Sequence, residues 1–363
     1  MDTMNIEGVY EWKVINTVTG EVKEHGKGKN KINPKMFYYS FPKPTDTEHT
    51  KHHNGAVRAR AINQIGLSPT VLDATEYINS GVSLGQGTAP KRLDNLRLSV
   101  NDNFVRTSVD TNDKGELCYI QTVSKKIEKG IAGTYHAFCG GFFYINNRTE
   151  IYPTIFSVIN LEQPLVLTDI DEVTITYSIY QKCPSTASPI VKQVNLNGRQ
   201  HTLSTVIHAP MIPYVVNSGQ FSYTTTIEDW QLWWPKHRVG NLPVAIYTES
   251  TGTKIFPNLK YHATSSSLAT VLVNGRPQGS TISLGYQDTI KFIENVSEPY
   301  PAPVKIKYQL DIPYTTTGSI DFINWFLFGS MMQVECTPTI VKTNEETFHL
   351  EWIITHEVPN ATQ

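Results

Sequence analysis

The stretch "LTDIDEVTITYSIY", residues 167–180, decides the class of fold. Apolar residues occupy every second position from Val173 to Ile179, with Thr or Ser between them. A period of two is that of a pleated strand with one buried face, and β-branched and aromatic residues suit such a strand. The polar "TDIDE" at its start is typical of a turn. We therefore predict a turn followed by a half-buried β-strand.

Similar strand patterns recur along the chain, whereas helical patterns are scarce. Strand-like runs occupy residues 9–16, 96–100, 116–123, 151–159, 244–249, 269–275, 289–294 and 304–312. Turn sequences lie between them, at 19–20, 112–115, 274–275 and 299–303. Residues 71–80 have the apolar spacing of a short helix, and the apolar run 319–332 fits either a buried helix or a strand. The chain is predicted to be mainly β.

The composition narrows the class of protein. The 363 residues are enough for two domains, and only 18% of them are charged. The net charge of −2 gives no positive field that would attract nucleic acid or an anionic membrane. No run approaches the ~20 apolar residues of a membrane span, and the N-terminus lacks the pattern of a signal peptide. The four cysteines form no CxxC pair, so we expect free thiols in a reducing cytoplasm and no zinc ribbon.

The C-terminal stretch "TNEETFHLEWII", residues 343–354, resembles the opening one. A shift of 175 positions places Thr168 on Thr343 and Tyr177 on Trp352, so that an acidic turn again leads into an alternating strand. Upstream, residues 93–99 resemble residues 287–293 with a shift of 194, as changes in loop length would produce. We interpret this as an internal duplication. The alternative is a chance alignment of similar strands.

These observations predict two similar antiparallel β-sandwich, jelly-roll-like domains with an N-terminal β-hairpin and an extended arm. The predicted division is a hairpin and arm at 1–59, a first sandwich at 60–182, a linker with an aromatic-rich segment at 183–239, and a second sandwich at 240–363. The arm mixes aromatic and polar residues without a period, and prolines interrupt it.

Two segments carry a resemblance to a known class of protein. They are "EWKVINTVTGEVKEHGKGKNKI" at 11–32 and "IFSVINLEQPLVLTDIDEVTITYSIY" at 155–180. Their strand, "TGE" turn, strand and closing alternating strand resemble β-domain proteins of the tail, neck and baseplate appendages of tailed bacteriophages. The second half of the chain departs from that pattern.

The resemblance implies a structural virion protein, made in the host cytoplasm, that self-assembles and docks onto other virion proteins. It implies a homo-oligomer such as a ring or a trimer, with no catalytic residues, no cofactor and no direct contact with nucleic acid or membrane. The alternative function is a carbohydrate- or receptor-binding module of a tail fibre or spike.

Aromatic clusters provide the candidate contact residues. Exposed Trp and Arg side chains are typical of protein interfaces and of glycan platforms, whereas buried ones fill a core. The candidates for an interface or a glycan site are Trp230, Trp233, Trp234, Arg238, Phe37, Tyr38, Tyr39 and Phe41. A weak metal-site candidate is the trio His49, His52 and His53, which is more typical of a solvated loop.

Catalytic motifs are missing from the sequence. No G-x-S-x-G, H-E-x-x-H or P-loop pattern occurs. His136 lies three residues before Cys139, but the partners of a deaminase or a thiol protease are absent, and we expect a packed strand there. A non-enzymatic protein is therefore predicted, with a polysaccharide depolymerase as the enzymatic rival.

Overall fold

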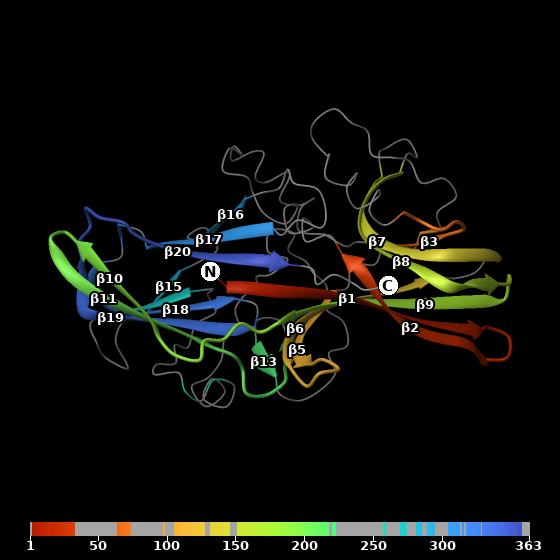
Figure 1. Cartoon of the computed structure of the whole chain (residues 1–363), viewed down its shortest axis with the longest axis horizontal. Coiled ribbons are helices and arrows are strands. Elements are labelled where there is room, and N and C mark those ends of the chain that lie inside the picture. The colour runs from red at the N-terminus through yellow and green to blue at the C-terminus, as the bar shows by residue number, and fades with distance from the viewer. Residues whose placement is uncertain are drawn as a thin grey trace.

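The computed structural model describes residues 2–32, 64–73, 97–98, 105–127, 131–145, 151–217, 220–222, 256, 258, 269–273, 281–284, 289–294, 304–312, 314–315, 317–327 and 329–357. Within these residues every regular element is a β-strand, which confirms the mainly β prediction (Figure 1). The strands of the N-terminal half are β1 (Asp2–Asn16), β2 (Val22–Ile32), β3 (Gln64–Ser68), β4 (Arg97–Leu98), β5 (Val105–Thr111), β6 (Leu117–Ile127), β7 (Gly133–Ile145), β8 (Ile151–Leu167) and β9 (Asp171–Lys182). They are followed by β10 (Ile190–Leu196), β11 (Arg199–His208), β12 (Tyr214–Asn217), β13 (Gln220–Ser222), β14 (Ala269–Val273), β15 (Thr281–Leu284), β16 (Thr289–Glu294), β17 (Val304–Ile312), β18 (Gly318–Leu327), β19 (Ser330–Lys342) and β20 (Phe348–Glu357).

Strand β9 contains the alternating stretch and lies at the centre of the first group of strands. Its side chains alternate between buried and half-buried positions, and Val173, Ile175 and Tyr177 are fully buried. It pairs antiparallel with β1 on one side and with β6 on the other. The alternation predicted from sequence is therefore confirmed.

Strands β1 and β2 form the predicted N-terminal hairpin. Asn16 fixes the turn, because its Oδ1 accepts hydrogen bonds from the backbone N–H groups of Val18 and Thr19. Gly20 follows with a φ of 74°, a conformation that glycine adopts at no steric cost. The antiparallel pairing then runs from Ile15 back to Gly8. The part of the predicted arm at 33–59 lies outside the described residues.

Strand β1 also joins the two groups of strands. Residues 2–5 pair parallel with residues 354–357 of β20, and residues 6–16 pair antiparallel with β9. In Figure 1, β1 runs from the group containing β17 and β20 to the group containing β8 and β9. The predicted N-terminal hairpin therefore pairs with strands of both groups.

The pairing pattern of strands β3–β9 recurs in strands β14–β20. In the first set β3 pairs with β4 and β7, β5 with β6, β6 with β9, and β7 with β8. In the second set β14 pairs with β15 and β18, β16 with β17, β17 with β20, and β18 with β19. All these pairs are antiparallel. An internal duplication predicts such a recurrence, and the division into two similar domains stays a prediction that this pattern supports.

Corresponding turns precede β9 and β20. The backbone N–H of Thr168 donates to Oδ2 of Asp171 at 2.7 Å, and the backbone N–H of Thr343 donates to Oε2 of Glu346 at 3.2 Å. Each turn carries the chain from one strand pair to another, from β8 to β9 and from β19 to β20. The acidic turn recognised in the sequence therefore has the same local hydrogen bond in both places.

Aromatic side chains fill the core at matching positions. Tyr177 of β9 stacks beside Tyr10 of β1 with ring centroids 4.4 Å apart, and the Tyr10 ring lies 6.0 Å from Phe138 of β7. In the other set, Trp352 of β20 meets Trp325 of β18 edge to face at 6.2 Å. Tyr10 and Tyr177 are direct partners in the β1–β9 pairing. The Tyr10–Phe138 and Trp325–Trp352 contacts instead join strands that do not pair with each other, as the facing layers of a sandwich do.

Two further predictions concern residues 183–239 and 319–332. The first segment was predicted to be a linker with strands of its own, and within it β10 and β11 form a hairpin that joins the six-stranded sheet β10-β11-β19-β18-β14-β15. The second segment is a pair of strands, β18 and the start of β19, rather than a helix. Residues 74–80 of the predicted short helix lie outside the described part of the chain, as does the strand predicted at 244–249.

The cysteines and the membrane prediction complete the description. All four cysteines are buried and free, which confirms the expected thiols. Among the described residues no helix has the length and apolar character needed to cross a membrane.

Candidate functional site

The contact residues predicted from sequence lie outside the described residues. This holds for the aromatic candidates, the arginine and the histidine trio: Phe37, Tyr38, Tyr39, Phe41, His49, His52, His53, Trp230, Trp233, Trp234 and Arg238. Their roles stay predictions. His136 and Cys139 do lie on a packed strand, β7, with Cys139 fully buried. The described surface offers two clefts, one narrow groove and an open sheet edge.

The first feature is a polar cleft of about 360 Å³ at one end of the six-stranded sheet. The turn of the β10–β11 hairpin and the turn between β19 and β20 form its walls, because β11 pairs with β19. Asn197 donates a hydrogen bond from Nδ2 to Oε1 of Glu346, and this bond joins the two turns. We call this feature the polar cleft; it is lined by Leu196, Asn197, Arg199, His201, Ile340, Val341, Lys342, Thr343, Glu346, Thr347 and Phe348.

Two buried basic side chains shape the polar cleft. Lys342 is 3% exposed, and its Nζ donates to the carbonyl of Thr343 at 3.2 Å. Burial lowers the pKa of Lys342, and the charge of Glu346 partly opposes this effect. Nδ1 of His201 lies 2.9 Å from the carbonyl oxygen of Pro338. A carbonyl only accepts, so Nδ1 holds the proton and Nε2 is the acceptor in the neutral ring.

The chemistry of the polar cleft favours binding of polar hydroxyl groups. Arg199 and Asn197 supply planar donors, Glu346 supplies an acceptor, and the ring of Phe348 supplies an apolar face. Its volume lies at the lower end of the range typical of small-ligand pockets. Glu346 is the one carboxylate among the described residues of its lining, whereas glycoside hydrolysis uses a pair.

The second feature is an apolar cleft of about 410 Å³ between the six-stranded sheet and β20. One wall carries Ile207 of β11 with Met332 and Val334 of β19, and the other carries Leu350 and Trp352 of β20. At its rim lies Ile190, which is 52% exposed. The space between the two layers is therefore open beside β10.

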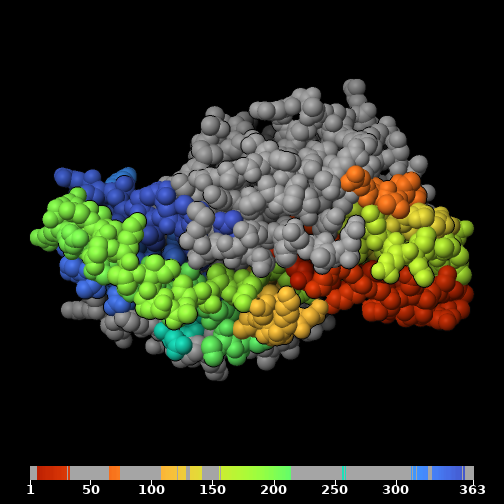
Figure 2. Space-filling view, viewed as in Figure 1, coloured from red at the N-terminus to blue at the C-terminus, as the bar shows by residue number. Residues whose placement is uncertain are grey.

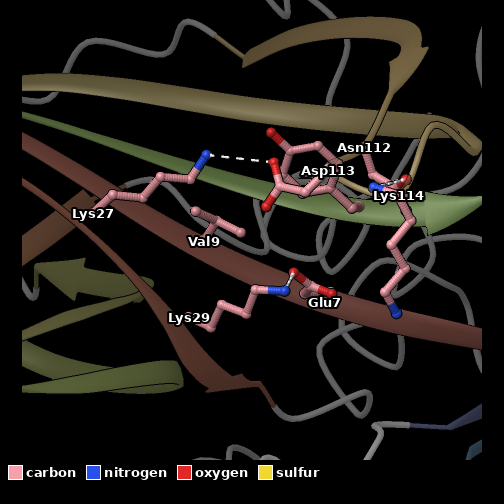
Figure 3. Close-up of a pocket in the computed structure, with 8 residues that line it drawn as sticks. Glu7, Val9, Lys27, Lys29, Asn112, Asp113 and Lys114 are labelled. Carbon is pink, nitrogen blue, oxygen red and sulfur yellow. Dashed lines mark hydrogen bonds and ion pairs between the residues drawn. The ribbon is translucent and has the colours of Figure 1, made fainter.

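The third feature is a narrow groove between β1, β2 and the β5–β6 turn, shown in Figure 3. Its volume of about 40 Å³ is close to that of a single water molecule in the liquid, ~30 Å³. Lys29 pairs with Glu7 at 2.6 Å, and Lys27 lies 3.9 Å from Asp113. Lys27 also forms a hydrogen-bonded pair with Glu11 at 3.1 Å, and this bond raises the pKa of Lys27. The charges of these side chains are paired and the groove is too small for a ligand. The ion pair between Lys27 and Asp113 therefore connects the β1–β2 hairpin to the β5–β6 turn.

The fourth feature is the open edge of β10. Within the described residues β10 pairs with β11 alone and ends the six-stranded sheet. Most of its side chains are exposed, including Ile190 and Val191 at 52% and 60%. The β10–β11 hairpin lies at the left of Figure 1, and its surface is light green at the left of Figure 2.

Comparison with known proteins assigns no family to the chain. No family model, no curated protein and no solved structure matches it. Among the described residues no group of three His, Cys, Asp or Glu side chains is placed to hold a metal ion.

Sequence reasoning missed the polar cleft and the β10 edge. A signal for the hairpin was present, because Asn197 and Gly198 form an "NG" pair between two strand-like runs. Asn197 has a φ of 52° and Gly198 a φ of 77°, as a two-residue hairpin turn requires.

Proposed function

We propose that the chain is a non-enzymatic structural protein of a phage virion, in the tail, the neck or collar, or an appendage. It acts by self-assembly and by docking onto other virion proteins. In this proposal the protein is made in the host cytoplasm and resides in the particle as a homo-oligomer.

One observation carries the proposal. The two segments that resemble phage tail and baseplate β domains, 11–32 and 155–180, are distant in sequence but meet in space. They form the strands β1 and β2 and the strands β8 and β9, and β1 pairs with β9 while β2 pairs with β8. The resemblance therefore concerns one connected structural unit.

The arrangement of the rest of the chain supports a mechanical role. Strand β1 hydrogen-bonds to both groups of strands, so a force on one group passes through backbone hydrogen bonds to the other. β8 is 17 residues long and pairs with β7 from one end to the other, with two register shifts. Open sheet edges provide a means of adding neighbouring subunits by strand pairing.

Quantitative mass spectrometry of purified phage particles tests this proposal. We expect the chain in the particle at a fixed copy number that is a multiple of a rotational symmetry, about six or twelve for a ring and three for a spike. Infected-cell lysate without particles serves as the control. Presence in the lysate and absence from the particles would overturn the proposal.

A second function, glycan binding, is favoured by the polar cleft. Donors, a carboxylate and an aromatic face surround a cavity of about 360 Å³ there. Titration with oligosaccharides released from the host cell surface tests it. We expect Arg199→Ala to weaken binding at least tenfold and Lys13→Ala, an exposed change on β1, to leave it unchanged. Equal binding by both variants would remove the polar cleft as the glycan site.

A further inference from the structure

Among the described residues, one row of backbone hydrogen-bonding groups of β10 has no strand partner, and the geometry of the β10–β11 hairpin identifies these groups. The two-residue turn makes Leu196 and Arg199 a hydrogen-bonded pair, so alternate residues from Leu196 back to Ile190 direct their N–H and C=O groups toward β11. The groups of Val191, Gln193 and Asn195 therefore point away from β11.

The side chains of β10 leave this edge accessible. Natural proteins protect edge strands with prolines, bulges, several charges or very short strands. The sequence of β10, "IVKQVNL", contains no proline and one charge, and its pairing with β11 has no register shift. An edge of this kind is suited to pairing with another strand.

We propose that β10 pairs antiparallel with β10 of a second copy of this chain, across a two-fold axis at Gln193. This names the partner of the assembly function proposed above, rests on that function, and requires an even copy number in the particle, as in a ring of six or twelve rather than a single trimer. In this register Gln193 lies opposite Gln193 of the second copy, and the residues with outward-pointing groups face one another. The pairing forms about six backbone hydrogen bonds and joins two six-stranded sheets into one.

The side chains fit this register. Val191 lies opposite Asn195 of the second copy, and Lys192 lies opposite Val194 of the second copy, so no like charges oppose each other. Ile190 lies opposite Leu196 of the second copy, which brings two apolar side chains together.

The pairing also covers the apolar cleft. Residues at every second position share one face of a strand, so Ile190 shares its face with Val194 and Leu196, both of which pack against the core. Ile190 lines the rim of the apolar cleft. Leu196 of the second copy lies beside it in the paired sheet and removes that rim from water.

The contact is small for an isolated dimer. A seven-residue strand pair buries less than the ~1,600 Å² typical of stable complexes, so we expect dimerisation to depend on protein concentration. In a particle, other contacts hold the copies together and raise their effective concentration.

Substitution at the two-fold axis tests the proposal. Gln193→Lys places two lysines directly opposite each other, so we expect the dimer dissociation constant from analytical ultracentrifugation to rise about two- to fivefold. The Gln193 side chain is exposed and accepts a hydrogen bond from Thr202 Oγ1 at 3.1 Å, so the monomer fold is expected to be kept in the variant. A wild type that stays monomeric at all concentrations, or an unchanged constant in the folded variant, would overturn the proposal.

Cysteine cross-linking tests the register independently. In the proposed register, the Cα atoms of the two Gln193→Cys residues lie ~5.5 Å apart. This Cα separation suits a disulfide. Asn195→Cys is the matched control, because its two copies lie about 13 Å apart along the strands. We expect mild oxidation to cross-link the first variant and not the second. Equal cross-linking of both, or none of either, would refute the register.

The outcomes separate the two proposals. If the chain is found in particles while Gln193→Lys leaves its oligomeric state unchanged, the β10 pairing fails and the virion function stands. If the β10 dimer forms and the chain is absent from particles, the virion function fails.

Discussion

Replacing Asp171 by Ala is expected to lower the free energy of unfolding by about 3 kcal/mol, because each of three hydrogen bonds contributes about 1 kcal/mol. Asp171 is fully buried at the start of β9. Its Oδ2 accepts from Nζ of Lys23 at 2.6 Å, and from the backbone N–H and the hydroxyl of Thr168, both at 2.7 Å. Alanine removes the acceptor and leaves the Thr168 N–H without this partner.

The corresponding residue of the second turn provides a matched control. Glu346 accepts from the backbone N–H of Thr343 at 3.2 Å, but it lies in a more exposed turn. Water replaces a lost acceptor there, so Glu346→Ala is expected to cost only about 0.5–1 kcal/mol. Both variants lose the same local backbone hydrogen bond, but Asp171→Ala also loses the buried bonds from Lys23 and the Thr168 hydroxyl, whereas Glu346→Ala loses the exposed bond from Asn197.

The effect of Asp171→Ala should also depend on pH. Burial alone would raise the pKa of Asp171, but the hydrogen bonds from Lys23 and Thr168 outweigh it and hold the pKa below its usual range. Because the folded-state pKa is depressed, the contribution is complete above the unfolded value of ~3.9 and is lost as the pH falls through the folded value.

Urea unfolding monitored by tryptophan fluorescence measures both effects, at pH 7 and in steps down to pH 3. The gap between wild type and Asp171→Ala should be largest near neutrality and shrink below about pH 4. Equal losses for Asp171→Ala and Glu346→Ala, or a gap that widens on acidification, would show that the buried bonds of Asp171 do not stabilise the fold.

Three further changes probe the core and the hairpin. Trp352→Ala should lower the free energy of unfolding by about 3–5 kcal/mol in denaturant titration, because Trp352 is 7% exposed and packs on Trp325; a loss under 1 kcal/mol would contradict the facing layers. Burial raises the pKa of the Cys139 thiol to about 12, so iodoacetamide at pH 8 should modify this thiol only after unfolding. Mass spectrometry measures the labelling. Rapid labelling of the native chain would show that Cys139 is not buried. Gly26→Ala should cost about 1–3 kcal/mol, because a Cβ there would overlap the Trp12 ring, and an unchanged melting temperature would show that the ring moves freely.

Local patterns predicted the strands whose two faces differ in burial. The stretch from Val173 to Ile179 alternates because one face of β9 is in the core, and the turn at Thr19-Gly20 has the residue types that such a turn needs. The run 319–332 was ambiguous because β18 lies between β14 and β19 and is buried along much of its length. Continuous burial removes the alternation that would distinguish a strand from a helix.

The features that the sequence did not predict depend on pairing between strands that are distant in sequence. The polar cleft joins residues 196–201 to residues 340–348, and they meet only because β11 pairs with β19. In the same way, the role of β1 between the two groups of strands depends on its contact with β20, at the other end of the chain. The β10 edge was missed for a local reason, since the "NG" turn at 197–198 lay in a segment assigned to a linker.

Cryo-electron microscopy of purified particles tests the assembly role most directly. We expect density for two sheet groups joined by a shared strand, repeated around a rotation axis, in the tail, neck or an appendage. Particle density that other chains explain completely, with this chain in none of it, would show that the protein has no assembly role in the virion.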